Sequence, residues 1–190
     1  MVRRLIYQEG ETDVDELTIE WLEAEEAEDV MNEIMKRYGQ DILQLVYSYV
    51  NDKTIAEDLT QDIFVKCYKS LHMYTGKSSF KTWLWRIAIN HCKDFLKSWY
   101  NKNVMIAEEE SAKNWSRNET VEQAVIQKDE DARLAFAVMS LPIKYREVII
   151  LFYFEELPIK EISAVLEVNE NTIKTRLKKA KELLKERLGE

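Results

Sequence analysis

Amide, hydroxyl and ammonium side chains gather near the C-terminus of the chain. Residues 171–188 hold seven basic and two acidic residues, a net charge of +5. On a helix, the polar face of this segment can donate hydrogen bonds to phosphates and to base edges in the DNA major groove. A simpler interpretation is an amphipathic helix whose polar face only contacts solvent. The positive charge of this segment, and the short helix predicted just before it, favour a DNA-binding helix instead. The candidate contacts are Asn171, Thr172, Lys174, Thr175, Lys178 and Lys179.

A second group of candidates interleaves basic with aromatic residues. Residues 76–103 contain six basic residues and one acidic residue, a net charge of +5. Cations bind a phosphate backbone and flat rings stack on unpaired bases, so this composition favours a melted strand over an intact duplex. The basic candidates are Lys77, Lys81, Arg86, Lys93, Lys97 and Lys102.

The aromatic residues of the same segment divide by their position on a helix. Phe80, Trp83 and Phe95 fall on the apolar side and are expected in the core. The rings nearer the polar side, which are the candidates for stacking on bases, are Trp85, Trp99 and Tyr100.

Carboxylates mark a third candidate surface. Asp58 and Asp62 are four residues apart, so on a helix they share one face and could hold Mg²⁺. A metal site needs further carboxylates from a second helix, and Glu33 and Asp41 lack the matching spacing. We therefore expect a solvated or protein-binding face and no metal.

The remaining chemistry-bearing residues predict neither a metal centre nor catalysis. Cys67 and Cys92 are too few to staple a chain of 190 residues and are expected to be free thiols. His91 adjoins Cys92, but neighbouring residues do not share a helix face. The sequence has no Gly-rich phosphate loop, nucleophile elbow or His-Glu-x-x-His motif, so we expect no cofactor and no enzymatic activity.

Apolar periodicity predicts the helices that position these candidates. Residues 30–49 and 55–71 repeat apolar side chains every three or four positions. Ser78 or Ser79 predicts the start of a helix that contains Phe80 to Ile87, and a further helical stretch is expected over about 90–99. Pro158 begins a short helix, and Asn169 is placed to cap the last one at helix-turn-helix spacing.

Composition fixes the fold class. Four Gly and two Pro are too few for an all-β sandwich or barrel, whereas 46% hydrophobic residues suffice for packed cores. The prediction is an all-α protein of two small helical domains joined by a flexible linker. No run of about 18 apolar residues occurs, and Met1–Glu20 lacks an apolar signal core, so the protein is expected in the cytoplasm without membrane contact of its own.

The net charge of −8 is unevenly distributed. Residues 1–30 hold eleven acidic and two basic residues, and residues 104–132 hold eight and three. Overall acidity therefore does not exclude a nucleic-acid partner. The predicted organisation is an acidic extension (1–29), a helical domain (30–103), an acidic linker (104–128) and a helix-turn-helix domain (129–190).

Four motifs resemble bacterial RNA polymerase sigma factors. AEDLTQDIF (56–64) and GKSSFKTWLWRIAIN (76–90) resemble the second conserved region, while LPIKYREVI (141–149) and TIKTRLKKA (172–180) resemble the fourth. Two such regions with only a short tether are similar to the small extracytoplasmic-function group. The resemblance implies an alternative sigma factor of the stress-response type, which would bind core polymerase, promoter DNA and an anti-sigma factor.

The resemblance also implies residue roles in binding the polymerase. The clamp helices of the largest polymerase subunit would dock on one face of residues 56–66, and the flap of the second-largest subunit would be a further contact. The implied docking residues are Asp58, Gln61, Asp62 and Lys66.

For DNA, Asn90 matches the position where the group captures a flipped base, and Trp83 and Arg86 match residues that line the melted strand. The last helix would read the minus-thirty-five element, with Arg176 following the family pattern. The full minus-ten set is Lys77, Lys81, Trp83, Arg86, Asn90, Lys93 and Lys97. The minus-thirty-five set is Asn171, Thr172, Lys174, Thr175, Arg176, Lys178 and Lys179.

The sequence departs from the group in three places. Residues 1–29 are additional, Glu167 stands in the turn where many members carry Gly, and Asn169 and Asn171 replace the commoner Ser and Gly. The acidic extension is a hypothetical mask for the basic surfaces, although a solubilising tail is the simpler interpretation.

Two other functions remain open from the residues alone. One is a helix-turn-helix regulator that binds its operator without polymerase. The other is an all-α metal-dependent hydrolase built on the Asp58 and Asp62 face.

Overall fold

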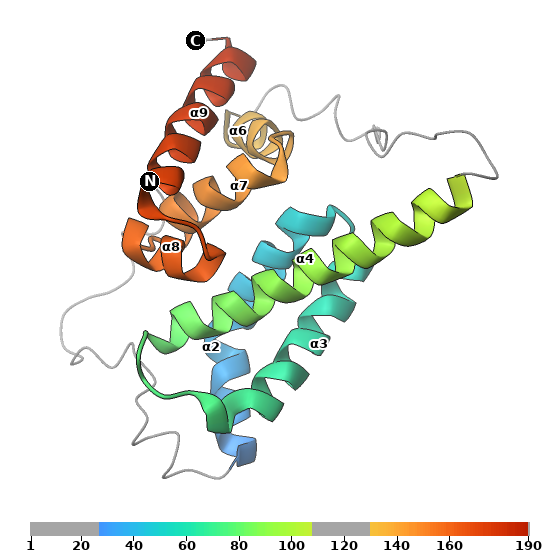
Figure 1. Ribbon diagram of the computed structural model, residues 1–190, viewed down its shortest axis with the longest axis vertical. Helices are drawn as coiled ribbons and strands as arrows, with labels where there is room; N and C mark the ends of the chain where they lie inside the picture. The colour runs from blue at the N-terminus through green and yellow to red at the C-terminus, as the bar shows by residue number, and fades with distance from the viewer. Residues whose placement is uncertain (1–26, 108–129, 190) are drawn as a thin grey trace.

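The computed structural model describes residues 27–107 and 130–189. Over these two ranges the chain forms helices and the turns between them, with no strand, which confirms the predicted all-α class (Figure 1). The predicted acidic extension and acidic linker lie outside the described residues, apart from 27–29 and 104–107.

The first bundle consists of α2 (Ala27–Val50), α3 (Lys53–Ser70) and α4 (Phe80–Ala107), with a 3₁₀ turn, Leu71–Met73, after α3. Apolar side chains at helical spacing bury one stripe of each helix. The stripe predicted for α2 is buried, and its members are Val30, Ile34, Tyr38, Ile42, Leu45, Val46 and Tyr49.

Side-chain caps fix where two of these helices begin. The backbone N–H of Ile55 donates to Asp52 Oδ1 at 2.9 Å, which starts α3. The N–H of Thr82 donates to Ser79 Oγ at 3.1 Å, which confirms Ser79 as the cap of α4.

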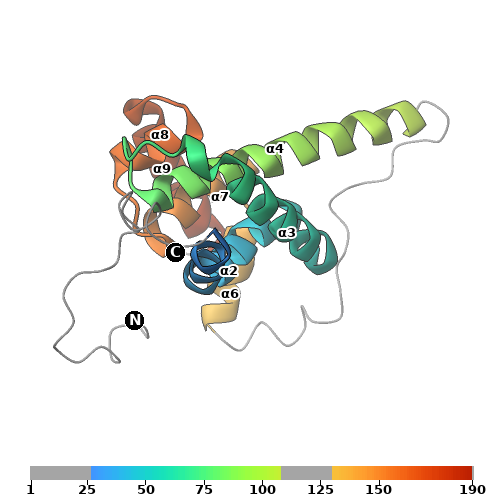
Figure 2. The same ribbon diagram turned by 90° about the horizontal axis from the view of Figure 1, so that it is seen from below.

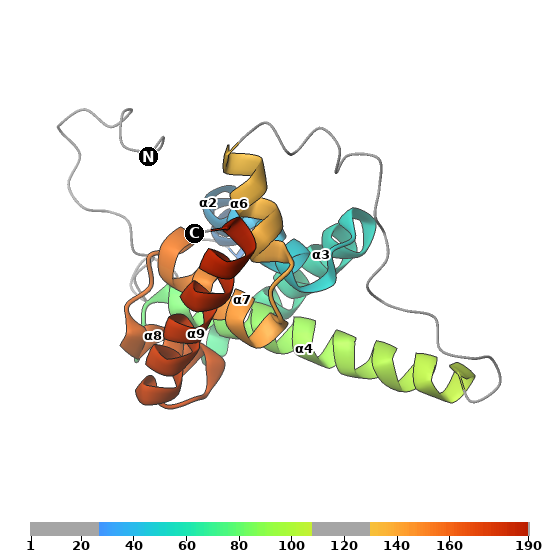
Figure 3. The ribbon, with the colours of Figure 1, turned by 90° about the horizontal axis from the view of Figure 1, so that it is seen from above.

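The two helical stretches expected after this cap form one helix. Apolar residues continue through Ile87, Ala88 and Ile89 into Cys92 without a breaker, so nothing interrupts the hydrogen-bond ladder. α4 also continues to Ala107, past the domain boundary predicted at 103. Its C-terminal end extends away from the other helices (Figures 2 and 3).

The second bundle consists of α6 (Glu130–Met139), α7 (Ile143–Ile149), a π-helical turn (Ile150–Phe154), α8 (Ile159–Leu166) and α9 (Glu170–Leu188). Its core includes residues of α8 and α9, which are Ile162, Val165, Ile173, Leu177 and Ala180.

The apolar residues at the start of α6 are only partly buried. Ala137 and Val138 lie in the core, whereas Leu134 is 41% and Phe136 51% exposed. The helical period places Phe136 on the side opposite Val138, whereas Leu134 shares a face with Val138 but lies one turn nearer the start of α6.

The two bundles contact each other. α8 lies against α4, and α7 lies against α2 (Figures 1 and 3). The surfaces predicted to bind DNA are therefore close to the interdomain contact.

Candidate nucleic-acid interface

The predicted minus-thirty-five surface is the outward face of α9. Asn169 caps the helix, because its Oδ1 accepts the backbone N–H of Thr172 at 3.1 Å. Buried Ile173 and Leu177 fix the rotation of α9 and leave the opposite face in solvent. The exposed members of the predicted set are Asn171, Lys174, Thr175, Lys178 and Lys179, with Thr172 half-buried.

The turn before α9 has left-handed backbone at Glu167, with φ 57° and ψ 38°. Its N–H donates to the carbonyl of Ser163, and Ser163 Oγ donates to the carbonyl of Val168 at 2.6 Å. A residue with a Cβ is strained in this conformation, which explains why Gly would be favoured there. These bonds hold a regular turn between α8 and α9 despite the Glu.

Arg176 differs from the rest of its set. Its Nη1 donates to Glu147 Oε1 at 2.9 Å, so its guanidinium faces α7 rather than solvent. In this arrangement Arg176 is half-buried and already neutralised by a carboxylate.

The predicted minus-ten surface follows α4 and the turn before it. Lys77, Asn90 and Lys97 are exposed, while Arg86 and Lys93 are half-buried. Because all but Lys77 lie on one helix, their order along the surface is fixed by the helical rise. An extended strand that follows α4 can therefore meet these side chains in sequence.

Trp83 is held in an aromatic cluster at the N-terminal end of α4. Its ring centre lies 5.4 Å from those of both Tyr74 and Phe80. Phe80 is fully buried, and Trp83 is half-buried at the edge of the same cluster. The structure thus keeps part of the Trp83 ring available at the surface.

Trp85 corrects the aromatic assignment. It is fully buried, edge-on to Tyr38 with ring centres 5.7 Å apart, and Lys81 Nζ lies 5.0 Å from its ring centre. The expectation that it faces the polar side was wrong, because α2 covers this part of α4. Tyr100, by contrast, is 65% exposed.

The predicted polymerase-docking residues share the outer face of α3. Asp58, Gln61, Asp62 and Lys66 are all exposed. Asp58, Asp62 and Lys66 follow at intervals of four residues and Gln61 is three after Asp58, so one broad partner surface can contact all four.

His91 connects this face to α4, a role that the sequence did not reveal. Lys66 Nζ lies 2.7 Å from His91 Nδ1, and Asp62 Oδ2 lies 3.7 Å from Nε2. Since the ammonium only donates, Nδ1 must accept and the ring proton is on Nε2, facing Asp62. Burial, followed by the charge of Lys66, lowers the pKa of His91 against the opposing effect of Asp62.

Glu147 on α7 is the second residue that sequence reasoning missed. Its side chain is 4% exposed, and its Oε2 accepts from Tyr49 Oη at 2.8 Å and lies 3.4 Å from Lys93 Nζ. Burial, followed by this carboxylate, raises the pKa of Tyr49 well above its usual value. With Arg176 on Oε1, Glu147 joins α2, α4 and α9.

A second set of polar contacts joins the bundles near the start of α4. Lys81 Nζ donates to the Glu155 carbonyl at 2.9 Å and lies 3.2 Å from Glu155 Oε2. Thr82 Oγ1 donates to Glu161 Oε2 on α8, and Ser79 Oγ lies 3.4 Å from the same oxygen. Lys81 is thus occupied in the same way as Lys93 and Arg176.

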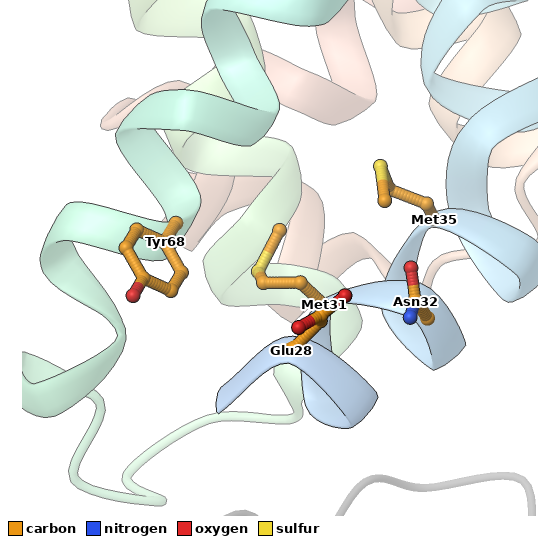
Figure 4. A pocket seen from close by; sticks show the side chains of 5 residues that line it. All are labelled: Glu28, Met31, Asn32, Met35 and Tyr68. Carbon is orange, nitrogen blue, oxygen red and sulfur yellow. The ribbon is translucent and has the colours of Figure 1, made fainter. Parts of the chain in front are cut away.

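A shallow hollow elsewhere on the first bundle has none of the predicted residues in its lining. It lies between the start of α2 and the outer side of α3 (Figure 4). Its lining residues are Glu28, Met31, Asn32, Met35 and Tyr68. In the parts of the chain that the structure describes, no helix is long and apolar enough to cross a membrane.

Family models match both bundles. The model of sigma-70 region 2 matches residues 34–100, and the model of sigma-70 region 4 matches residues 131–184. The order of the two regions is the one inferred from the motifs.

Relatives match over most of their length. The chain is 30% identical over 168 residues to the ECF RNA polymerase sigma factor SigW of Bacillus subtilis (strain 168), covering 85% of this chain and 90% of SigW. It is 31% identical over 148 residues to the RNA polymerase sigma factor SigV of the same organism, covering 78% and 84%.

Two solved structures share the fold. One is the sigma factor RpoE bound to the anti-sigma factor NepR from Bartonella quintana, with a TM-score of 0.68 at 20% identity over 85% of this chain and 98% of that one. The other is CnrH in complex with the cytosolic domain of CnrY, with a TM-score of 0.63 at 23% identity over 85% and 89%.

Proposed function

The chain belongs to the extracytoplasmic-function group of bacterial RNA polymerase sigma factors, and from this membership we propose how its three surfaces direct initiation. It is an alternative sigma factor that binds core RNA polymerase and promoter DNA. The observation that carries the proposal is the presence, in one chain, of an exposed basic helix in region 4 and a basic, aromatic helix in region 2.

We propose that α9 reads the minus-thirty-five element in the major groove. Asn171, Lys174 and Thr175 offer amide, ammonium and hydroxyl groups to base edges and phosphates near the N-terminal end of α9. Lys178 and Lys179, one turn further, are placed to bind phosphates. Duplex contacts of this kind fix the register of the protein on the promoter.

We propose that α4 holds the melted minus-ten strand. Asn90 is exposed on the helix, where its amide can pair with the edge of a flipped base. The half-buried ring of Trp83 can stack on a neighbouring base, and exposed Lys97 can bind the phosphate backbone. Base capture offsets the unstacking cost of a few kcal/mol per step.

We propose that the α3 face docks on the clamp helices of the largest polymerase subunit, with a flap contact to the region 4 domain. The hydrogen bond of Lys66 to His91 supports this assignment, because it links the α3 face to α4. Polymerase docking on α3 would therefore orient Asn90, the neighbour of His91, toward the DNA.

Sigma factors are transcription initiation factors rather than enzymes, and we propose that this chain has no catalytic activity of its own. We expect it to act in the cytoplasm, where core polymerase is located. The solved structures with NepR and CnrY support a further expectation, that this chain has an anti-sigma partner.

Binding to core polymerase distinguishes this function from that of a regulator that acts on DNA alone. We expect the chain to form a stable complex with core polymerase. Asp58→Lys should weaken that complex at least about tenfold, because a like charge facing a complementary surface costs several kcal/mol. Glu28→Lys, the same charge reversal at an exposed position of α2, is the matched control. Sequence-specific operator binding without any affinity for core polymerase would support the regulator instead.

A further inference from the structure

An exposed apolar surface on the first bundle lies outside the surfaces proposed to bind polymerase and DNA. It is the hollow between α2 and α3, which is lined by Glu28, Met31, Asn32, Met35 and Tyr68 (Figure 4). Met35 is 43% and Tyr68 53% exposed, and Val65, three residues before Tyr68 on α3, is 50% exposed. Large apolar side chains that gather in one exposed place indicate a binding surface, whereas single ones are ordinary.

Positively charged side chains border the hollow. Lys36 follows Met35 on α2, and its side chain is 81% exposed. Lys69 follows Tyr68 on α3 and is also exposed. Residues 30–103 together hold eleven basic and seven acidic residues, a net charge of +4. A segment that fits this surface should therefore combine apolar side chains with negative charge.

The chain carries a segment of this composition shortly before α2. Val14, Leu17 and Trp21 recur at intervals of three and four residues, so on a helix they share one face. Residues 13–26 hold seven acidic residues and no basic residue. A helix over residues 14–22, which lie outside the described part of the chain, would present apolar side chains flanked by carboxylates.

The connection between this segment and the hollow is short enough. α2 begins at Ala27, and the hollow is lined from the first turn of that helix onward. Along α2 the lining from Glu28 to Met35 covers about 10 Å at the helical rise. The five residues from Leu22 to Ala27 reach about 17 Å when extended. A reversal of the chain at residues 23–26 is therefore sufficient to lay the segment over the hollow.

We propose that residues 14–22 form a helix that docks in this hollow and completes the first bundle as a fourth helix. In this arrangement Leu17 and Trp21 cover the exposed parts of Met35 and Tyr68, and a thioether beside an aromatic ring is a favourable contact. The acidic residues of the segment lie toward the bordering lysines. The inference is independent of the proposed function, because it concerns only packing within the chain.

Hydrogen exchange of the full chain is the first test, read by mass spectrometry on peptides that cover residues 12–26. A helix as short as this segment is unstable in water by itself, so its amides are protected only if it packs on the bundle. We expect these amides to exchange at least about tenfold more slowly than in an unfolded chain. Exchange at the unfolded rate in the wild-type protein would overturn the proposal.

Met35→Glu and Met73→Glu locate the docking site. Both variants replace an exposed methionine of the first bundle by Glu, and Met73 is 64% exposed and outside the lining of the hollow. Met35→Glu places a charge in the apolar hollow opposite an acidic segment, so exchange of residues 14–22 should return to within about twofold of the unfolded rate. Met73→Glu should keep the wild-type protection. Equal protection in the two variants would show that the segment does not dock in this hollow.

Tyr68→Ala and Tyr100→Ala form a second matched pair, which decides the matter if circular dichroism shows Met35→Glu to be unfolded. Both tyrosines are more than half exposed, but only Tyr68 lines the hollow. Protection of residues 14–22 should fall in Tyr68→Ala and stay at the wild-type level in Tyr100→Ala. The same protection in both variants would overturn the proposal.

Dilution distinguishes docking within one chain from docking between two copies. Protection of the segment should not depend on protein concentration, because the segment and the hollow belong to the same molecule. Protection that is lost on dilution, together with a fall in molecular mass to that of the monomer, would assign the hollow to a contact between copies and would overturn the proposal.

Discussion

Asn90→Ala tests the assignment of base capture to α4. Asn90 is exposed, and among the described residues its side chain has no hydrogen-bond partner. Removing its amide should therefore change the free energy of unfolding by no more than about 0.5 kcal/mol. A fold defect is thus not expected to obscure the effect on DNA.

The effect on promoter opening should be much larger. A well-formed amide pair with a base edge contributes about 1–3 kcal/mol. If this interaction exists only after the base has flipped, its loss lowers the equilibrium constant for open-complex formation by about 5- to 150-fold. Duplex binding by α9 should be unchanged, because α9 belongs to the other domain.

The assay is open-complex formation by the polymerase holoenzyme, followed by permanganate reactivity of unpaired thymines. Ser98→Ala, an exposed position two turns further along α4, is the matched control. Wild-type opening by Asn90→Ala, with no change in base preference, would refute the assignment.

Three further predictions concern α9, the turn before it and the interdomain tyrosine. Glu167→Gly should raise the free energy of unfolding of the region 4 domain by about 0.5–1 kcal/mol in urea titrations, because it relieves the left-handed strain at φ 57°. As a control, Glu186→Gly, inside the exposed part of α9, should lower this free energy by about 1 kcal/mol. A loss of stability in Glu167→Gly would contradict backbone strain at Glu167. Lys174→Ala should weaken holoenzyme binding to a minus-thirty-five duplex for all sequences and reduce the slope of log affinity against log salt by about 1, whereas an unchanged slope means that Lys174 contacts no phosphate. The pKa of Tyr49 is raised on folding, so the contribution of the neutral Tyr49 side chain to stability is present below the unfolded pKa of about 10 and is lost as pH rises above that value. Tyr49→Phe should therefore flatten the fall in thermal stability at alkaline pH. An equally steep fall in this variant would contradict the raised pKa of Tyr49.

The helices and their caps were predictable because they depend on neighbours in sequence. The apolar stripe of α2 and the caps Ser79 and Asn169 were confirmed, since each involves residues within a few positions of one another. The continuity of α4 was missed because clusters of aromatic residues weakened the apparent period, although no breaker separates its two halves.

Long-range neighbours could not be predicted in this way. Trp85 was wrongly placed because its burial depends on Tyr38, a residue of another helix. The sequence gives no sign that Glu147 is buried, because its partner Tyr49 is 98 positions away. The strain at Glu167 was signalled only by the resemblance, which places Gly in that turn.

Transcription by core polymerase reconstituted with this chain tests directly whether the chain acts as a sigma factor. Genomic DNA fragments serve as template, and primer extension maps the 5′ ends of the transcripts. We expect discrete start sites that appear only when the chain is added and that are lost with Asn90→Ala. A folded chain that binds DNA equally well with and without core polymerase, and that produces no start site, would contradict it.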